Sequence, residues 1–153
     1  MQRIEIPQRG TIELQHAVFD VNGTLAVDGV LLPGVVDKLE RLSSLLSITL
    51  LTAGTHGNLD VLKSTLNYPF HVIQTGEDKE RFVQKLGAAN VIAFGNGAND
   101  ARMLRAAAIG IAVITAEGLA CSALQAADVL AQGPLHAIDL VMLPKRLVAT
   151  LRT

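Results

Sequence analysis

The sequence contains few aromatic residues, one cysteine and almost no excess charge, and each shortage excludes a class of protein. Phe, Tyr and Trp make up 3% of the 153 residues, which leaves few platforms for stacking single-stranded bases. The formal net charge of −1 gives no electrostatic footprint for nucleic acid or for an anionic membrane. Cys121 is the one cysteine, so an intramolecular disulfide is excluded and a zinc cluster cannot form on cysteine alone. We therefore expect no nucleic-acid partner.

Long apolar runs are also missing, although the mean hydropathy is positive at +0.38. The best runs, residues 45–51 and 106–116, are of strand length or are interrupted by glycine, and a membrane-spanning helix needs roughly 18 to 20 apolar residues. The opening stretch MQRIEIPQRG has no apolar segment of the kind that signal peptides carry. These features predict a cytoplasmic enzyme or binding domain without a membrane partner.

What the sequence does contain is the material for a packed core. Half of the residues are hydrophobic and 18% are charged, which is typical of a folded domain and not of a disordered chain. The length suits one domain. Since no repeat, linker or low-complexity segment interrupts the sequence, we expect residues 1–153 to form a single domain.

Patterns of strands and helices alternate along most of the chain. Residues 3–6 and 11–15 read as two strands joined by a turn, and the Asp-Gly pair in AVDGVLL, residues 26–32, predicts a small hairpin. Pro33 suits the first turn of a helix in which Val35, Val36, Leu39 and Leu42 recur at helical spacing. Further strands are predicted at residues 16–21, 47–52, 70–75, 90–95, 109–114 and 127–132. Helices are predicted at residues 58–66, 77–87, 98–108 and about 117–126.

This alternation predicts an α/β fold with a parallel sheet. Right-handed crossovers place every strand-to-helix loop at the carboxyl edge of such a sheet, where ligands bind. Four loops should therefore carry the chemistry, namely those after Asp20, after Thr52, before Lys79 and after Gly95.

The loop after residues 16–21 holds the first group of candidate residues. Asp20 ends an apolar strand, where its carboxylate can act as a nucleophile or bind a cation. Gly23 lets the backbone approach a ligand, and Thr24 can donate a hydrogen bond to a phosphate. The competing interpretation is structural, because Asp20 and Asn22 are also common turn residues.

The other three loops give weaker signals when each is taken alone. The Thr52 hydroxyl and the amides that follow it can cradle a phosphate, although a strand-end threonine is more often structural. Lys79 can neutralise phosphate charge, but a solitary lysine is expected on the solvated surface, and Lys85 points to another face of the same helix. Asn96 and Asp100 lie at a helix start, where backbone amides favour anions. His56 is expected to be a solvated loop residue.

Taken in order, these loops resemble the haloacid dehalogenase superfamily of phosphohydrolases and phosphotransferases. The resemblance covers residues 16–132 and rests on Asp-x-x-Gly-Thr-Leu from Asp20, a strand-end Thr52, Lys79, and Gly-x-Gly-x-Asn-Asp from Gly95. Residues 78–113 look especially similar to the phosphorylation domain of P-type ATPases. The octulosonate-phosphate phosphatases, which lack a cap domain, look similar too.

The resemblance implies a three-layered Rossmann-like fold with strand order 3-2-1-4-5, a small flap after the first strand and no cap domain. It implies that Asp20 becomes an aspartyl phosphate and that the Asn22 backbone carbonyl binds Mg²⁺. The phosphoryl group would be held by six residues: Gly23, Thr24, Thr52, Ala53, Gly54 and Lys79. The loop with Asn96 and Asp100 would complete the metal site.

Two positions depart from the family pattern, and both replace a carboxylate with an amide. Family phosphatases carry an aspartate as general acid and base where this chain has Asn22, and a metal-binding aspartate where it has Asn96. An amide has no proton to deliver, and it adds no negative charge to a Mg²⁺ site. P-type ATPases also have a lysine where this chain has Val21.

Two functions therefore stay open. One is a slow, Mg²⁺-dependent phosphatase or phosphotransferase acting through Asp20, and the other is an inactive relative that binds a phosphorylated ligand or a protein partner. The short gaps between the loops leave no room for a cap, so an open site suits a macromolecular phosphorylated substrate or a cover from a neighbouring subunit. The apolar tail at residues 135–152 suggests a subunit interface, or a helix packed on the sheet and broken near Pro144.

Overall fold

Six parallel strands form the central sheet of the computed structural model, which describes residues 1–54 and 57–153. The strand order is β10-β9-β8-β3-β6-β7. When the six strands are numbered along the chain from β3, their order is 6-5-4-1-2-3. This is the predicted order 3-2-1-4-5 with one further strand, β10, beside β9. The strands are β3 (His16–Asp20), β6 (Ser47–Thr52), β7 (Phe70–Val72), β8 (Val91–Gly95), β9 (Ile109–Ile114) and β10 (Val129–Gln132).

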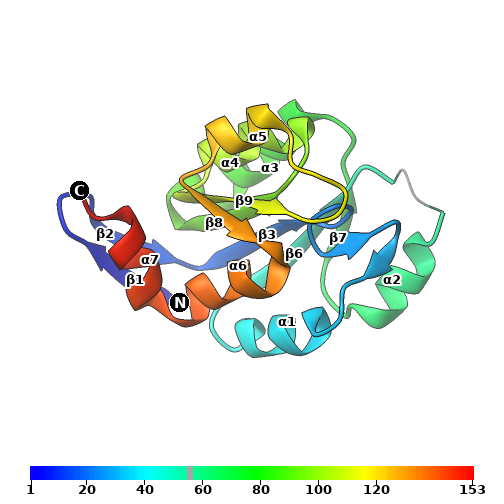
Figure 1. The fold of residues 1–153 in the computed structure, drawn as a ribbon, viewed down its shortest axis with the longest axis horizontal. Coiled ribbons are helices and arrows are strands. Elements are labelled where there is room, and N and C mark those ends of the chain that lie inside the picture. Colours follow the sequence, from blue (N-terminus) through cyan, green and yellow to red (C-terminus); the bar gives the residue numbers. More distant parts are fainter. Residues whose placement is uncertain (55–56) are drawn as a thin grey trace.

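Helices cover both faces of this sheet and give the predicted three-layered arrangement (Figure 1). One face is covered by α1 (Val35–Ser43) and α6 (Gly133–Met142), with α2 (Leu59–Thr65) near its edge. The other face is covered by α3 (Gly76–Leu86), α4 (Ala101–Ala106) and α5 (Cys121–Ala126). Two short 3₁₀ helices, η1 (Ala88–Asn90) and η2 (Ala98–Asp100), flank β8.

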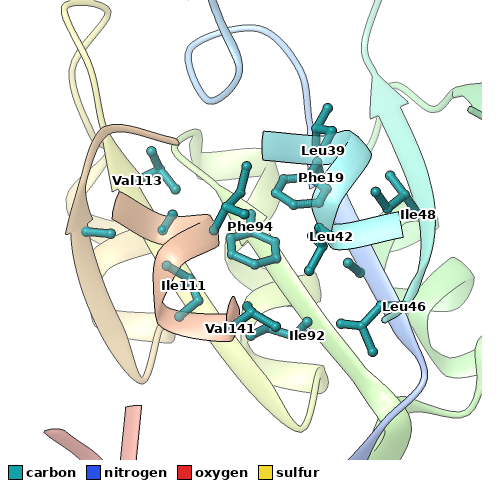
Figure 2. Close-up of a cluster of buried hydrophobic side chains, with 14 of the residues drawn as sticks. Phe19, Leu39, Leu42, Leu46, Ile48, Ile92, Phe94, Ile111, Val113 and Val141 are labelled. Carbon is teal, nitrogen blue, oxygen red and sulfur yellow. The ribbon is translucent and has the colours of Figure 1, made fainter. Parts of the chain in front are cut away.

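The larger core lies between the sheet and α1 and α6 (Figure 2). At its centre the rings of Phe19 and Phe94 stack with their centroids 4.2 Å apart, which joins the two strands that carry most of the site. Both rings are fully buried. Burying a phenylalanine stabilises a fold by about 1.5 to 3 kcal/mol, so the positions of β3 and β8 are firmly set.

Two hairpins stand outside the central sheet. An N-terminal hairpin pairs β1 (Gln2–Ile6) with β2 (Gly10–Leu14), and α7 (Pro144–Leu151) packs against β1 (Figure 1). The flap pairs β4 (Ala26–Val27) with β5 (Val30–Leu31). Asp28 and Gly29 have φ angles of 51° and 77°, the two positive values that a tight Asp-Gly hairpin turn requires. The predicted hairpin is confirmed.

Some local predictions are corrected by the structure. Pro33 lies before α1 rather than in its first turn, because Gly34 at φ 84° caps the helix. Val36 is 40% exposed, on the outer side of α1. The tail at residues 135–152 forms two helices, α6 and α7, that meet at Leu143 and Pro144, which confirms the predicted break near Pro144. Within the described residues no helix has the length and apolar character to cross a membrane.

Candidate functional site

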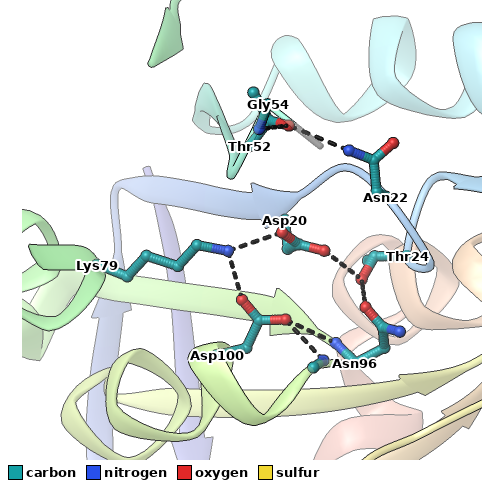
Figure 3. A network of polar contacts seen from close by, with 9 residues as sticks. Asp20, Asn22, Thr24, Thr52, Gly54, Lys79, Asn96 and Asp100 are labelled. Atoms are coloured by element: carbon teal, nitrogen blue, oxygen red, sulfur yellow. Dashed lines mark hydrogen bonds and ion pairs between the residues drawn. The ribbon is translucent and has the colours of Figure 1, made fainter. Parts of the chain in front are cut away.

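The polar residues that the sequence singles out meet at the carboxyl edge of the sheet (Figure 3). Asp20 is the last residue of β3, Thr52 the last of β6 and Gly95 the last of β8. Because β3 is central and pairs with both β6 and β8, the loop after each strand lies next to Asp20. Parallel strands place their carboxyl ends at one edge, and this convergence follows from the topology.

Lys79 is buried between the two carboxylates of Asp20 and Asp100. Its Nζ donates to Asp20 Oδ1 at 2.7 Å and to Asp100 Oδ1 at 2.6 Å (Figure 3). The side chain is fully buried, so the expectation of a solvated surface lysine is wrong. The first turn of α3 brings Lys79 under the sheet edge, with the Thr75 hydroxyl capping the helix by accepting from Asp78 N at 3.1 Å.

Burial and charge act in opposite directions on this cluster. The pKa of Asp20 is raised from 3.8 to about 7, because burial and the nearby Asp100 carboxylate, which raise it, outweigh Lys79 and Thr24, which lower it. Burial by itself would lower the pKa of Lys79, but attraction to Asp20 and Asp100 outweighs burial and raises it. Lys79 therefore stays a cation at neutral pH, and Asp20 is poised between its two protonation states.

Asp100 anchors the loop that follows β8. Its Oδ2 accepts from the backbone N–H groups of Asn96 at 3.0 Å and Gly97 at 2.8 Å, and Lys79 occupies its other oxygen. A Cβ at Gly95 would lie 2.6 Å from the Asp100 Cβ, which explains the glycine at that strand end. The backbone amides of Asn96 and Gly97, which were expected to bind an external anion, therefore bind the carboxylate of Asp100.

Thr24 joins the nucleophile candidate to the loop after β8. Its hydroxyl lies 3.3 Å from both Asp20 Oδ2 and Asn96 Oδ1. Gly23 has a φ of 81°, and a Cβ there would lie 2.3 Å from Asn96 Nδ2. Only glycine allows the two loops to approach this closely.

Asn22 faces β6 rather than Asp20. Its Nδ2 donates to Thr52 Oγ1 at 3.1 Å, and the same hydroxyl accepts from Gly54 N at 3.2 Å (Figure 3). The Asn22 Oδ1 is buried and has no hydrogen-bond partner. The structure therefore brings Asn22, Thr52 and Gly54 together at the sheet edge that carries Asp20, and leaves one acceptor unsatisfied.

A cavity of about 190 Å³ opens beside these residues. Its lining consists of Asp20, Asn22, Ala53, Asn96, Gly97, Asn99 and Glu117. Sequence reasoning missed the last two side chains among these. Asn99 belongs to the motif already identified after β8, and Glu117 follows β9, so the rule that ligands bind at the carboxyl edge would have pointed to both.

A larger hollow, of about 440 Å³, lies at the opposite edge of the sheet. It is bounded by residues at the starts of β3 and β6, including His16 and Ser47, together with Met1 and the end of α1. No carboxylate lines it. Since ligands of open parallel sheets bind at the carboxyl ends of the strands, the smaller cavity is the candidate site.

The flap turn is bonded to loops on both sides of Asp20. The Asp28 backbone N–H donates to Glu117 Oε2 at 3.2 Å, and Asn58 Nδ2 donates to the Gly29 carbonyl. Glu117 follows β9, whereas Asn58 precedes α2 after β6. The turn is therefore hydrogen-bonded to the loops after β9 and after β6, and one of its two partners, Glu117, lines the cavity.

The oxygens around the cavity are of the kind that Mg²⁺ binds. Its side chains supply two carboxylates, from Asp20 and Glu117, and three amides, from Asn22, Asn96 and Asn99. Hard divalent cations take carboxylate, amide and backbone carbonyl oxygens, so the donor types fit. Within the described residues there is no cluster of three or more acidic, His or Cys side chains that could hold a metal, so we expect weak binding.

Two other residues named from the sequence do not add to the site. Lys85 lies on the exposed side of α3, as predicted. His56 lies outside the described residues.

A family model agrees with this geometry. The model of haloacid dehalogenase-like hydrolases matches residues 36–129, which is more than half of the chain. This protein belongs to the haloacid dehalogenase-like hydrolase family. The resemblance seen in the sequence is thereby confirmed, while a comparison with curated proteins gives no match.

Solved structures of the same superfamily share the fold. The cobalt-bound deoxy-D-mannose-octulosonate 8-phosphate phosphatase of Haemophilus influenzae is 16% identical, with a TM-score of 0.65 over 92% of this chain and 94% of that one. The octulosonate 8-phosphate phosphatase of Moraxella catarrhalis, solved with magnesium and phosphate ions, is 17% identical, with a TM-score of 0.63 over 91% and 94%. At these identities the likeness shows the fold alone.

A zinc-transporting P-type ATPase is more similar in sequence. It is 28% identical over 79% of this chain, with a TM-score of 0.61, and the match covers 20% of the ATPase chain. Residues 78–113 predict a similarity to P-type ATPases. This match confirms the similarity for the part of the ATPase chain that it covers.

Proposed function

We propose that this protein is a slow, Mg²⁺-dependent phosphohydrolase or phosphotransferase that forms an aspartyl phosphate at Asp20. The observation that carries the proposal is the position of Asp20, which ends a central strand, lines the cavity and is hydrogen-bonded to the buried Lys79. A carboxylate held beside a fixed cation at a ligand site is suited to nucleophilic attack on phosphorus. The phosphatases among the structural neighbours support a phosphorylated substrate.

Each neighbouring residue has a role in this proposal. The Thr24 hydroxyl and the Lys79 ammonium orient the Asp20 carboxylate through its two oxygens. Asp100 holds Lys79 and the Asn96–Gly97 amides in place, and is therefore a positioning residue. Thr52, the amides of Ala53 and Gly54, and Gly23 surround the position that a bound phosphoryl group would take.

The same edge would hold the metal. We assign Mg²⁺ to the Asp20 carboxylate, the Asn22 backbone carbonyl and the Asn96 amide oxygen, with Asp100 supporting the loop. When bound, Mg²⁺ would neutralise the negative charge of the phosphoryl oxygens. Because Asn96 brings no charge, the affinity for Mg²⁺ should be low.

Asn22 is the reason that we expect a slow rate. Hydrolysis of an aspartyl phosphate needs a base that takes a proton from water, and an amide is not such a base. The phosphoenzyme should therefore persist once it forms.

The second candidate function is a catalytically inactive domain that binds a phosphorylated ligand or a protein partner. Asn22 and Asn96 favour it, because both replace groups that hydrolysis uses. Crystals soaked with Mg²⁺ and beryllium fluoride, a phosphoryl mimic, separate the two. Density joined to the Asp20 carboxylate supports the enzyme, and its loss in Asp20→Asn confirms the attachment. An empty site at saturating concentration supports the binding function instead.

A further inference from the structure

The cavity has an unusual shortage of groups that can give up a proton. Asn22 stands at the position where phosphatases of this family carry their general acid. Its amide is held by the hydrogen bond from Nδ2 to Thr52 Oγ1 at 3.1 Å. Its other end, Oδ1, is a buried acceptor without a partner. Neither end carries an acidic proton, so Asn22 cannot protonate a leaving group.

Lys79 and Thr24, the two side chains that donate to Asp20, are both bonded within the cluster of site residues. Lys79 is fully buried and its ammonium donates to both Asp20 and Asp100. The Thr24 hydroxyl has one proton, shared between Asp20 and Asn96. Glu117, the remaining acid on the cavity, accepts a hydrogen bond from the flap at Asp28 N.

Because Asn22 has no proton to give, the site is best suited to a donor whose leaving group departs as a stable anion. An alkoxide is about as strong a base as hydroxide, so it is a poor leaving group unless it receives a proton. A carboxylate is the conjugate base of an acid with a pKa of about 4. Acyl phosphates therefore transfer their phosphoryl group without a proton, whereas alkyl phosphate esters depend on general acid catalysis, which contributes roughly 10² to 10⁴-fold.

The size of the cavity restricts the donor further. Its volume of about 190 Å³ corresponds to roughly six water molecules at their share of liquid volume. Glu117, which lines the cavity, is also held by the flap turn through the hydrogen bond from Asp28 N. A phosphoryl group with a leaving group of a few atoms suits this space.

We infer that the phosphoryl donor of this site is a small acyl phosphate, an inference that rests on the proposed formation of an aspartyl phosphate. Asp20 Oδ attacks phosphorus, and the bond between phosphorus and the acyl oxygen breaks. The electron pair leaves with that oxygen as a carboxylate, so no proton is transferred and no further reactant is needed. The aspartyl phosphate then persists, because Asn22 does not activate water.

The test compares two small donors, acetyl phosphate and glycerol 3-phosphate, with the full chain and Mg²⁺. Formation of the phosphoenzyme is followed by intact mass and located at Asp20 by peptide mapping, with Asp20→Asn as the unlabelled control. We expect acetyl phosphate to label the protein at least about 10²-fold faster than the ester. In Asn22→Asp the phosphoenzyme should also hydrolyse, so release of glycerol and of acetate is measured instead of the label. The difference in rate between the two donors should narrow, because the ester gains most from an acid.

Each of the other possible outcomes contradicts a different claim. Equal labelling by both donors, or ester labelling that is lost in Glu117→Gln, overturns the acyl phosphate inference and leaves the proposed function intact, because an acid would then be present. Labelling by ATP but not by acetyl phosphate overturns the inference that the phosphoryl donor is small. If neither wild type nor Asn22→Asp is labelled by any donor, the proposed function itself fails.

Discussion

Lys79 Nζ lies 2.7 Å from Asp20 Oδ1, although 59 positions separate the two residues in the sequence. The lysine is fully buried and also contacts Asp100 at 2.6 Å. One cation therefore holds two carboxylates together at the sheet edge. Since the Asp20 carboxylate is the proposed nucleophile, this pair links the stability of the fold to the chemistry of the site.

Replacing Lys79 by a neutral residue should lower the free energy of unfolding. Lys79→Met leaves two buried carboxylates facing each other, and removing one partner of a buried ion pair typically costs about 3 to 5 kcal/mol. Urea unfolding measures the loss. Lys85→Met, an exposed change in the same helix, should stay within about 0.5 kcal/mol of wild type.

A second substitution tests whether charge is the cause. Adding Asp20→Asn to Lys79→Met removes the repulsion between Asp20 and Asp100, so part of the lost stability should return. If Lys79→Met unfolds at the same urea concentration as wild type, the buried pair does not exist in solution.

The raised pKa of Asp20 predicts how stability depends on pH. Asp20 titrates near pH 7 in the folded protein and near 3.8 in the unfolded chain, so the folded state keeps a proton that the unfolded state has lost. The Asp20 contribution to the free energy of unfolding therefore falls as pH rises from about 4 to about 7, by up to about 1.4 kcal/mol per pH unit. Above pH 7 this contribution is constant.

Asp20→Asn removes this dependence. In EDTA, the Tm of the variant relative to wild type should rise between about pH 5 and pH 7 and then level off. Thermal unfolding of both proteins at several pH values measures the difference. A difference in Tm that does not change with pH would show that Asp20 ionises normally in the fold.

Mg²⁺ affinity should improve when Asn96 becomes acidic. Asn96→Asp adds a second carboxylate among the proposed ligands, and we expect Mg²⁺ to bind about tenfold more tightly or better, equivalent to about 1.4 kcal/mol. Calorimetry measures the affinity. Asn99→Asp adds the same charge to the same cavity and should gain less, because Asn99 is not a proposed ligand. Equal gains in both variants would argue for general electrostatic attraction rather than ligation.

Catalytic turnover should appear when both amides are replaced. Asn22→Asp supplies the missing acid and base, worth roughly 10² to 10⁴-fold, and Asn96→Asp strengthens Mg²⁺ binding. The two effects need not add, because the residues share one site. Release of p-nitrophenol from p-nitrophenyl phosphate by the double variant measures the gain.

The control for this experiment is the loss of the nucleophile. Adding Asp20→Asn to the double variant should abolish the activity, since no aspartyl phosphate can form. Activity that survives this change comes from a contaminating phosphatase. A double variant without any gain would favour the binding function over the dormant enzyme.

Much of this fold could be predicted from the sequence, because the signals that specify it are local. Alternating strand and helix patterns, the Asp28-Gly29 turn and the glycine that ends α3 each depend on neighbours in the chain. The parallel topology then places Asp20, Thr52 and Gly95 at one edge. For these reasons the α/β class, the strand order and the location of the site followed from the residues and from the resemblance they carry.

The environment of each site side chain was decided by tertiary structure. Lys79 has the sequence context of a surface lysine, yet two carboxylates from β3 and the loop after β8 surround it. Asp100 takes the loop amides that an external anion was expected to use, and Glu117 reaches the cavity because β9 lies beside β8. Burial, pKa and hydrogen-bond partners depend on which strands become neighbours, and residues far apart in sequence carry no local signal of that contact.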